Sequence, residues 1–130
     1  YALHEAAEPF DLGPWRVTPL PVQHGPDTIL GYRVDDFAFI TDVSRIPEAT
    51  LDRMRGLDVM ALDCLWKKPH STHLSLSQAM EYATRIGARR TYFIHMSHDL
   101  EHEETQALLP AGQFLATPRT CGCSLWCWGC

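Results

Sequence analysis

The segment LDVMALDCLWKKPHSTHLSLSQAMEYATRIGARRTYFIHM, residues 57–96, predicts a strand, a loop, a helix and a second strand in succession. Residues 57–65 are a short, mostly apolar run, and the polar loop 66–73 is rich in Lys, His and Pro. Apolar side chains then recur at steps of three and four up to Gly87, a typical helix stop. Strands that alternate with helices indicate an α/β sheet.

The sequence before this segment predicts further strands. Residues 15–24, WRVTPLPVQH, alternate apolar and polar side chains, but Pro19 and Pro21 favour an edge strand or a broken one. TILGYRV and FAFITD, residues 28–34 and 37–42, flank two aspartates and predict a β-hairpin. The second of these strands is apolar at almost every position, so we expect both of its faces to be covered.

The remaining segments complete the predicted order of elements. Ser44 is a plausible N-cap for a helix that runs from Pro47 to about Arg55. Residues 102–110 predict a helix with an acidic start, and QFLAT, residues 113–117, a last strand. Residues 1–14 are weakly patterned and predict a loop or the end of a missing element.

Composition limits the classes of function. The 130 residues suffice for one compact domain, and 45% hydrophobic with 21% charged residues argues against disorder. A formal net charge of -5 offers no electrostatic footprint for nucleic acid. Small anionic substrates are compatible with it, because a bound metal can dominate the local field.

No long apolar run predicts a membrane span, and the first residues lack the pattern of a secretory signal. The chain opens at Tyr1 rather than Met, so we expect a fragment or a processed product. Cys64 lies alone in an apolar run, where a buried, inert thiol is expected. The otherwise Cys-free body predicts a reducing, cytoplasmic setting.

Metal-capable side chains follow the predicted strands. His24, Asp42 and His95 each come at a strand end, and the loop after strand 57–65 holds His70 and His73. Ligands gather beyond the C-terminal ends of strands in open α/β sheets. Imidazole and carboxylate groups bind zinc, manganese or iron, and two metals about 3.5–4 Å apart can promote attack on a phosphoester.

Each of these residues has a structural alternative. His24 could cap a turn, Asp42 could form an Asx turn, and His95 could be a satisfied core histidine. His70, Asp99 and His102 could face solvent or support ligands from behind. His73 could be a simple loop residue, and Asp63 could be paired locally within its strand.

The segments VQHG, FAFITDVSRIPE and LDCLWKKPHSTHLSLSQAMEYATRIGARRTYFIHMSHD resemble the second half of metallo-β-lactamase-fold hydrolases. They are most similar to the phosphoribosyl cyclic phosphate phosphodiesterase branch, which is related to the tRNA 3′-processing ribonucleases. The resemblance covers residues 15–117. It implies an α/β fold, namely the C-terminal half of an αββα sandwich with a mixed sheet and helices on one face, whose other face stays apolar and exposed unless another half covers it.

The resemblance also implies a site. His24, Asp42 and His95 match family metal ligands, with Asp42 bridging two divalent ions, zinc or manganese. His73 matches the imidazole that protonates the leaving oxygen or binds the phosphate. His98 and Asp99 are expected to contact the metal ligands from behind and orient them.

The family motif H-x-H-x-D-H is absent from this sequence. We therefore expect a lineage that hydrolyses phosphodiesters or cyclic phosphates by a metal-bound hydroxide, with weak metal binding and impaired turnover in this chain. The expected partners are a small phosphorylated substrate and a second copy or the missing N-terminal half. The alternative is a non-catalytic fragment or partner-binding half-domain.

After Pro118 the sequence RTCGCSLWCWGC carries four cysteines and two tryptophans. Its C-x-C and C-x₂-C spacings could chelate zinc. We favour an unrelated tail, since nothing flanking it would pack as a core. The predicted organisation is therefore a partial metallo-β-lactamase-like domain over residues 1–117 and an unstructured Cys/Trp-rich tail over residues 118–130.

Overall fold

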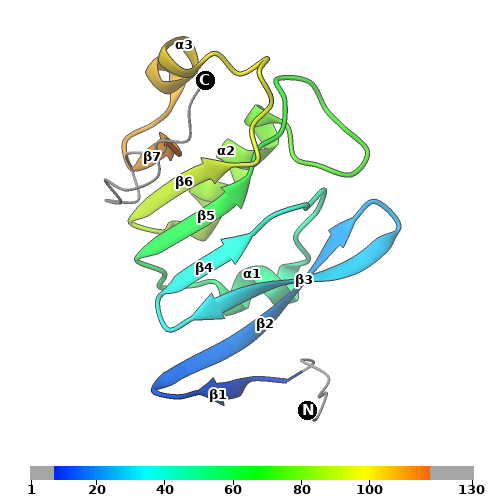
Figure 1. Cartoon of the computed structure of the whole chain (residues 1–130), viewed down its shortest axis with the longest axis vertical. Coiled ribbons are helices and arrows are strands. Elements are labelled where there is room, and N and C mark those ends of the chain that lie inside the picture. Colours follow the sequence, from blue (N-terminus) through cyan, green and yellow to red (C-terminus); the bar gives the residue numbers. More distant parts are fainter. Residues whose placement is uncertain (1–7, 118–130) are drawn as a thin grey trace, which may run out of the picture.

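A computed structural model describes residues 8–117 and shows one seven-stranded sheet with three helices (Figure 1). The prediction of a separate tail at residues 118–130 lies outside the described residues. The strands are β1 Phe10–Leu12, β2 Trp15–His24, β3 Asp27–Val34, β4 Phe37–Ile40, β5 Val59–Asp63, β6 Arg90–Ile94 and β7 Gln113–Leu115. The helices are α1 Glu48–Arg53, α2 Leu76–Ile86 and α3 His102–Leu108.

The order of strands in the sheet is the same as their order in the chain. Strands β1 to β4 are antiparallel, and β4 to β7 are parallel. The sheet is therefore mixed, as predicted. Because β4, β5 and β6 run in the same direction, their C-terminal ends meet at one edge of the sheet, and the residues that follow them come together there.

Helix α2 is well specified by its sequence. Ser75 and Gln78 form a capping box, in which the Ser75 hydroxyl accepts from the Gln78 backbone N–H at 3.4 Å. At the other end Gly87 has a φ of 69°, a left-handed conformation that favours glycine and ends the helix. The buried side of the helix presents Leu76, Ala79 and other apolar residues to the sheet.

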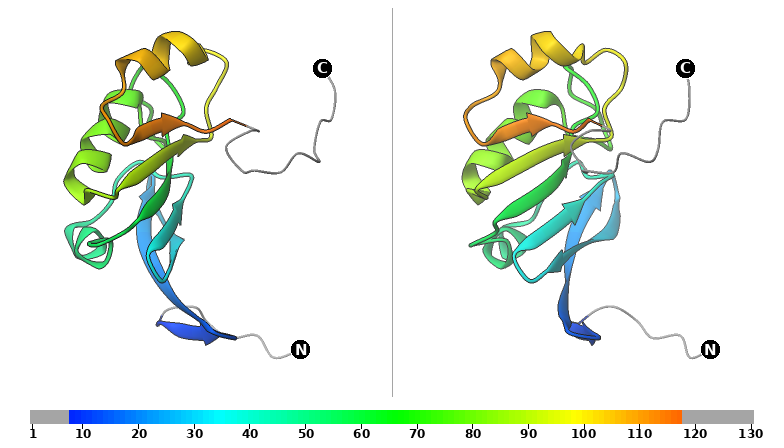
Figure 2. Two further views of the ribbon diagram at one scale, coloured as in Figure 1. Left: turned by 90° about the vertical axis from the view of Figure 1, so that its left-hand side faces the viewer. Right: turned by 60° about the vertical axis from the view of Figure 1, so that its left-hand side comes forward.

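The core lies between the sheet and the helices α1 and α2. Four strands of the sheet contribute to it side chains that are 0% exposed, namely Leu20, Ile40, Met60, Leu62 and Phe93. Figure 2 shows α1 and α2 on one face of the sheet. No helix of the described residues covers the other face, so the prediction of helices on one face is confirmed.

The uncovered face of the sheet is apolar and partly exposed. We call it the open face, and its exposed large side chains are Leu30, Tyr32, Phe37, Phe39 and Phe114. Phe39 is 44% exposed, whereas its neighbour Ile40 on the covered face is 0% exposed. The expectation that both faces of this strand are covered is thus met on one face only within residues 8–117.

The first strand was missed by the sequence analysis, which predicted a loop or the end of a missing element for residues 1–14. Residues 10–12 pair with β2 in an antiparallel hairpin, with Leu12 opposite Trp15. Gly13 closes the turn with a φ of 61°. A three-residue strand carries too short a pattern to identify, and its pairing depends on the strand beside it.

The prolines of β2 do not break the strand. The Thr50 hydroxyl donates to the Pro21 carbonyl at 2.6 Å, and the Arg53 guanidinium donates to the Pro19 carbonyl at 3.4 Å. The backbone groups of both prolines therefore face α1 rather than β3, on the side where no N–H is needed for the sheet. Strand β1 pairs only with residues 15–17 of β2, so the part of β2 that contains the prolines is an edge of the sheet, as predicted.

Cys64 is fully buried, as predicted, and burial raises the pKa of its thiol to about 12. Such a thiol stays protonated and is a poor nucleophile. Within residues 8–117 no helix combines the length and apolar character needed to cross a membrane.

Candidate metal centre

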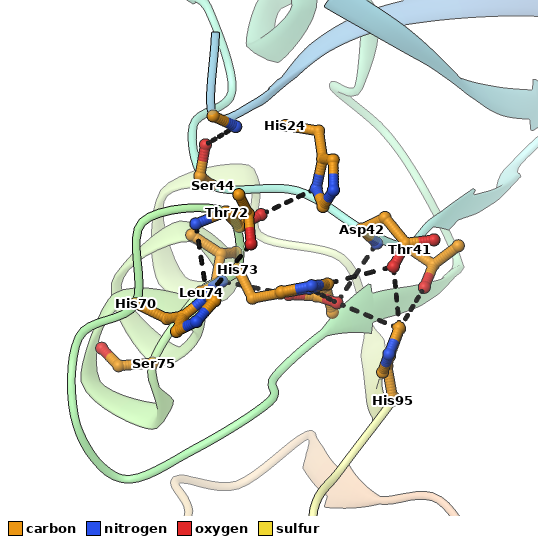
Figure 3. Close-up of polar contacts among 12 residues, drawn as sticks. His24, Thr41, Asp42, Ser44, His70, Thr72, His73, Leu74, Ser75 and His95 are labelled. Carbon is orange, nitrogen blue, oxygen red and sulfur yellow. Dashed lines mark hydrogen bonds and ion pairs between the residues drawn. The ribbon is translucent and has the colours of Figure 1, made fainter. Parts of the chain in front are cut away.

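The candidate site lies at the C-terminal edge of the parallel strands (Figure 3). Asp42 follows β4, Asp63 ends β5, and His95 follows β6 directly. Asp42 and His95 have φ values of 56° and 60°, in the left-handed region that few non-glycine residues adopt. Such backbone strain is concentrated at functional sites, where the surrounding structure holds it in place.

Four side chains converge there: Asp42, Asp63, His73 and His95, with one donor atom from each lying within 4.8 Å of all the others. The Nδ1 atom of His95 is 3.2 Å from Asp42 Oδ1 and 3.6 Å from Asp63 Oδ1. The Nδ1 atom of His73 is 3.3 Å from Asp63 Oδ1 and 3.9 Å from Asp42 Oδ1. We call these four residues the rim cluster.

Asp63 is the member of the rim cluster that the sequence analysis did not select. Its carboxylate is 0% exposed and accepts the backbone N–H of Leu74 at 3.0 Å and that of Asp42 at 3.2 Å. Burial raises the pKa of Asp63, while the Leu74 N–H and the His73 ring lower it. An acidic residue at the end of an apolar strand is the sequence pattern that could have identified Asp63. The sequence analysis considered only that this carboxyl could pair with neighbours within its strand.

His73 is held against this buried carboxylate. Its side chain is 12% exposed, and its Nδ1 contacts Asp63 Oδ1 at 3.3 Å. A carboxylate oxygen accepts, so Nδ1 is the donor, and Nε2 is left for a second partner. The His73 ring also lies 4.9 Å from the His95 ring, centroid to centroid.

His24 lies beside the rim cluster without being one of its four members. Its ring is 5.1 Å from the His73 ring, and its Nδ1 lies 3.0 Å from the Thr72 carbonyl oxygen. A carbonyl only accepts, so Nδ1 donates, and Nε2 is the nitrogen left for a metal. Ser44 does not cap α1, whose N-cap is Pro47, but bonds Gly25 N and the Gln23 carbonyl at the same turn.

His98 and Asp99 lie apart from the rim cluster. His98 Nε2 is 3.6 Å from Asp99 Oδ1, and their side chains are 95% and 61% exposed. Within residues 8–117 neither side chain has a hydrogen bond or ion pair with the four clustered residues. Their support of the ligands stays a prediction.

The rim cluster has the donor set of a divalent metal. Ligands about 2.1 Å from a tetrahedral ion are about 3.4 Å from one another, close to the 3.2 Å between His95 Nδ1 and Asp42 Oδ1. Two neighbouring carboxylates, one of them buried, also need positive charge nearby. A divalent ion supplies such charge. The residues therefore fit such an ion.

An α/β sheet that carries carboxylates and imidazoles at the C-terminal edge of its parallel strands is typical of metal-binding α/β proteins. The family follows from comparison, since residues 2–96 match the family model of the beta-lactamase superfamily domain. The chain belongs to the beta-lactamase superfamily.

Solved structures agree with this assignment. A crystal structure described as a new diphosphatase from the PhnP family is 46% identical, with a TM-score of 0.83 over 88% of this chain and 44% of that one. The metallo-beta-lactamase fold protein YhfI from Bacillus subtilis is 19% identical, with a TM-score of 0.72 over 89% of this chain and 52% of that one, which shows the fold. The chain thus spans less than half of the diphosphatase chain.

Among curated proteins, an octanoyltransferase from Porphyromonas gingivalis (strain ATCC BAA-308 / W83) is 31% identical over 104 residues. The match covers 78% of this chain and 21% of that protein. Together these comparisons confirm the predicted resemblance to metallo-β-lactamase-fold hydrolases and the α/β fold class, and they place the chain in a hydrolase lineage.

Proposed function

We propose that this chain supplies part of the active site of a metal-dependent hydrolase that cleaves phosphodiester, cyclic phosphate or phosphoanhydride bonds in a small substrate. The convergence of Asp42, Asp63, His73 and His95 at one edge of the sheet is the observation that carries the proposal. The 46% identity to a protein described as a diphosphatase supports the phosphate chemistry.

Asp42 and His95 are the proposed ligands, together with His24 if the ring turns its free Nε2 inward. Zinc and manganese both suit this mixture of carboxylate and imidazole. When bound, a divalent cation lowers the pKa of a water molecule and neutralises charge that develops on the phosphate. Because a carboxylate has two oxygens that can each bind a metal, Asp42 would suit a bridging position between two ions.

His73 is the proposed proton donor to the leaving oxygen. The Asp63 carboxylate holds His73 Nδ1, so the ring orientation is fixed and Nε2 carries the proton that moves. Asp63 also accepts the backbone N–H of Leu74, next to His73 in the chain, and so positions both the ring and its loop. This pairing of a buried acid with an imidazole favours proton transfer over a simple loop role for His73.

The chain alone offers few ligands for two ions, because the sequence has no H-x-H-x-D-H motif. We therefore propose weak metal uptake and impaired turnover for the chain by itself, with His98 and Asp99 as outer support for the ligands. The missing ligands would come from further sequence or a partner that also covers the open face. The cytoplasmic setting is supported by Cys64, the free buried thiol of the described residues.

A second candidate is a half-domain that binds a partner without catalysis. The open face favours it, because Phe37, Phe39 and Phe114 are 37–44% exposed on a single surface. Contiguous exposed apolar surface of this kind marks interaction sites. This candidate predicts association of the chain without bound metal.

Metal content tests the proposed function. The purified chain is dialysed to equilibrium against buffers of known zinc or manganese concentration, and its metal content is measured by mass spectrometry. We expect bound metal in the wild type, little in Asp42→Asn and His95→Ala, and wild-type content in Asp58→Asn, a matched acidic control at the opposite edge. Equal content in all four proteins would overturn the rim cluster as a metal centre.

A further inference from the structure

A cavity of about 460 Å³ lies beside the rim cluster, and in the described residues Trp66, Lys67, Lys68 and Asp99 line it. The first three belong to the loop that follows β5, and Asp99 belongs to the loop that follows β6. The same two strands carry Asp63 and precede His95. The volume is in the range of small-molecule sites, about 300–1,000 Å³.

A short series of ring contacts connects the cavity wall to the proposed proton donor. The Trp66 and His70 rings are 4.7 Å apart, centroid to centroid, and the His70 and His73 rings are 5.6 Å apart. A ligand in the cavity is therefore within reach of the rim cluster. A substrate longer than a single phosphate can occupy both places.

The charge of this loop differs from that of the rest of the chain. Lys67 and Lys68 are the only lysines in a sequence with a net charge of -5. Arg85 and Arg89 form ion pairs with Glu48 and Asp58. Neither lysine has a hydrogen bond or ion pair within the part of the chain that the structure describes, so both ammonium groups are available to an anion.

We propose that this cavity binds the nucleoside of a nucleoside diphosphate-like substrate together with the phosphate attached to it, an assignment that rests on the proposed hydrolase function. Lys67 and Lys68 bind phosphate oxygens, and the Trp66 indole packs on the planar ring. Asp99, which only accepts hydrogen bonds when ionised, suits the sugar hydroxyls. The loop with Lys67 and Lys68 then selects the substrate, whereas the rim cluster takes part in its cleavage.

The lysines allow a direct measurement. Reductive ¹³C-methylation of the full chain labels Lys67, Lys68 and the α-amine and keeps the lysine charges. We expect titration with ADP, in the presence of a chelator, to shift both lysine signals saturably and to leave the α-amine signal in place. Inorganic pyrophosphate, which lacks the ring, should shift the same signals with an affinity about fivefold weaker or more.

Variants separate the cavity from general charge. Lys67→Ala with Lys68→Ala should weaken ADP binding at least about tenfold in calorimetry. Arg16→Ala with Arg55→Ala, which removes two exposed charges elsewhere, should bind as the wild type does. Trp66→Leu should weaken ADP binding about fivefold and leave pyrophosphate binding unchanged.

Absent or unsaturable lysine shifts would overturn the proposal, as would equal losses in the lysine and arginine pairs. Unchanged ADP binding by Trp66→Leu would overturn the ring contact and with it the nucleotide assignment. Because the titration contains no metal, a failed metal assay overturns the proposed function alone. The two failures are thus distinguishable.

Discussion

The two edges of the parallel part of the sheet carry similar residue types in opposite arrangements. At the N-terminal edge, the Asp58 carboxylate contacts the guanidinium groups of Arg89 and Arg90. At the C-terminal edge, the Asp42 and Asp63 carboxylates lie beside two imidazoles, those of His73 and His95. Within the described residues, no arginine or lysine forms an ion pair with either carboxylate.

The difference separates a structural charge cluster from a functional one. Asp58 meets its opposite charges within the fold, and a hydrogen bond from Arg89 lowers the pKa of that carboxyl. Asp63 is buried without a fixed cation, and burial raises its pKa. A carboxylate whose charge is matched inside the chain needs no ligand, whereas an unmatched buried carboxylate indicates a cation supplied from outside.

Among variants at the two edges, removal of the buried Asp63 carboxylate should have the largest effect on stability. Asp63→Ala leaves the backbone N–H groups of Asp42 and Leu74 without an acceptor, so we expect a loss of about 2–5 kcal/mol in the free energy of unfolding. Urea denaturation in chelator measures it. Asp58→Asn is the control, and a loss as small as in that variant would contradict the structural role of Asp63.

His73→Ala should affect catalysis more than folding. In a form of the enzyme that includes the H-x-H-x-D-H segment, we expect turnover of a phosphodiester substrate to fall about a hundredfold or more. His102→Ala, at the start of α3, should leave turnover unchanged. Full activity of the His73→Ala enzyme would end the proton-donor assignment.

Glycine at His95 should separate backbone strain from ligand binding. His95→Gly removes a side chain from a left-handed position, so in chelator we expect the free energy of unfolding to rise by about 0.5 kcal/mol. Metal binding should be lost. Asp35→Gly, with a φ of 52° in the turn before β4, is the matched control that relieves strain and keeps metal binding. Loss of stability in His95→Gly alone would show that its side chain contributes more than the strain costs.

The N-terminal edge should give the smallest effect. Because the folded-state pKa of Asp58 is lowered, its stabilising contribution is present above the ordinary carboxyl pKa and disappears as the pH falls through the folded-state value. Asp58→Asn should therefore be slightly less stable than the wild type at neutral pH and equal to it in acid. Thermal melts over this pH range would show a constant difference if the ion pair were not the cause.

The sequence predicted the order of the main elements because each carries its own pattern. The helical periodicity before Gly87 and the apolar run before Asp63 are local properties. The positions of Asp42, His73 and His95 near one edge also follow from strand direction, since residues that follow parallel strands share an edge.

What the sequence could not supply was the direction of individual side chains. Asp63 and Asp58 both flank the same apolar strand, and only the fold shows that one faces imidazoles and the other arginines. His98 follows His95 by three residues yet lies exposed beside Asp99. The short strand β1 depends on pairing with β2, which no local pattern encodes.

The strands lie in the sheet in the same order as in the chain, which allows the sheet to assemble one strand at a time. Every strand pairs with its predecessor, so each new strand can add to an edge that the preceding residues have already formed. Loop closure then involves only the span of a hairpin or of one connecting helix, which is a small entropic cost at each step. The sheet can therefore grow in one direction during synthesis, and the rim cluster is complete once residue 95 has joined it.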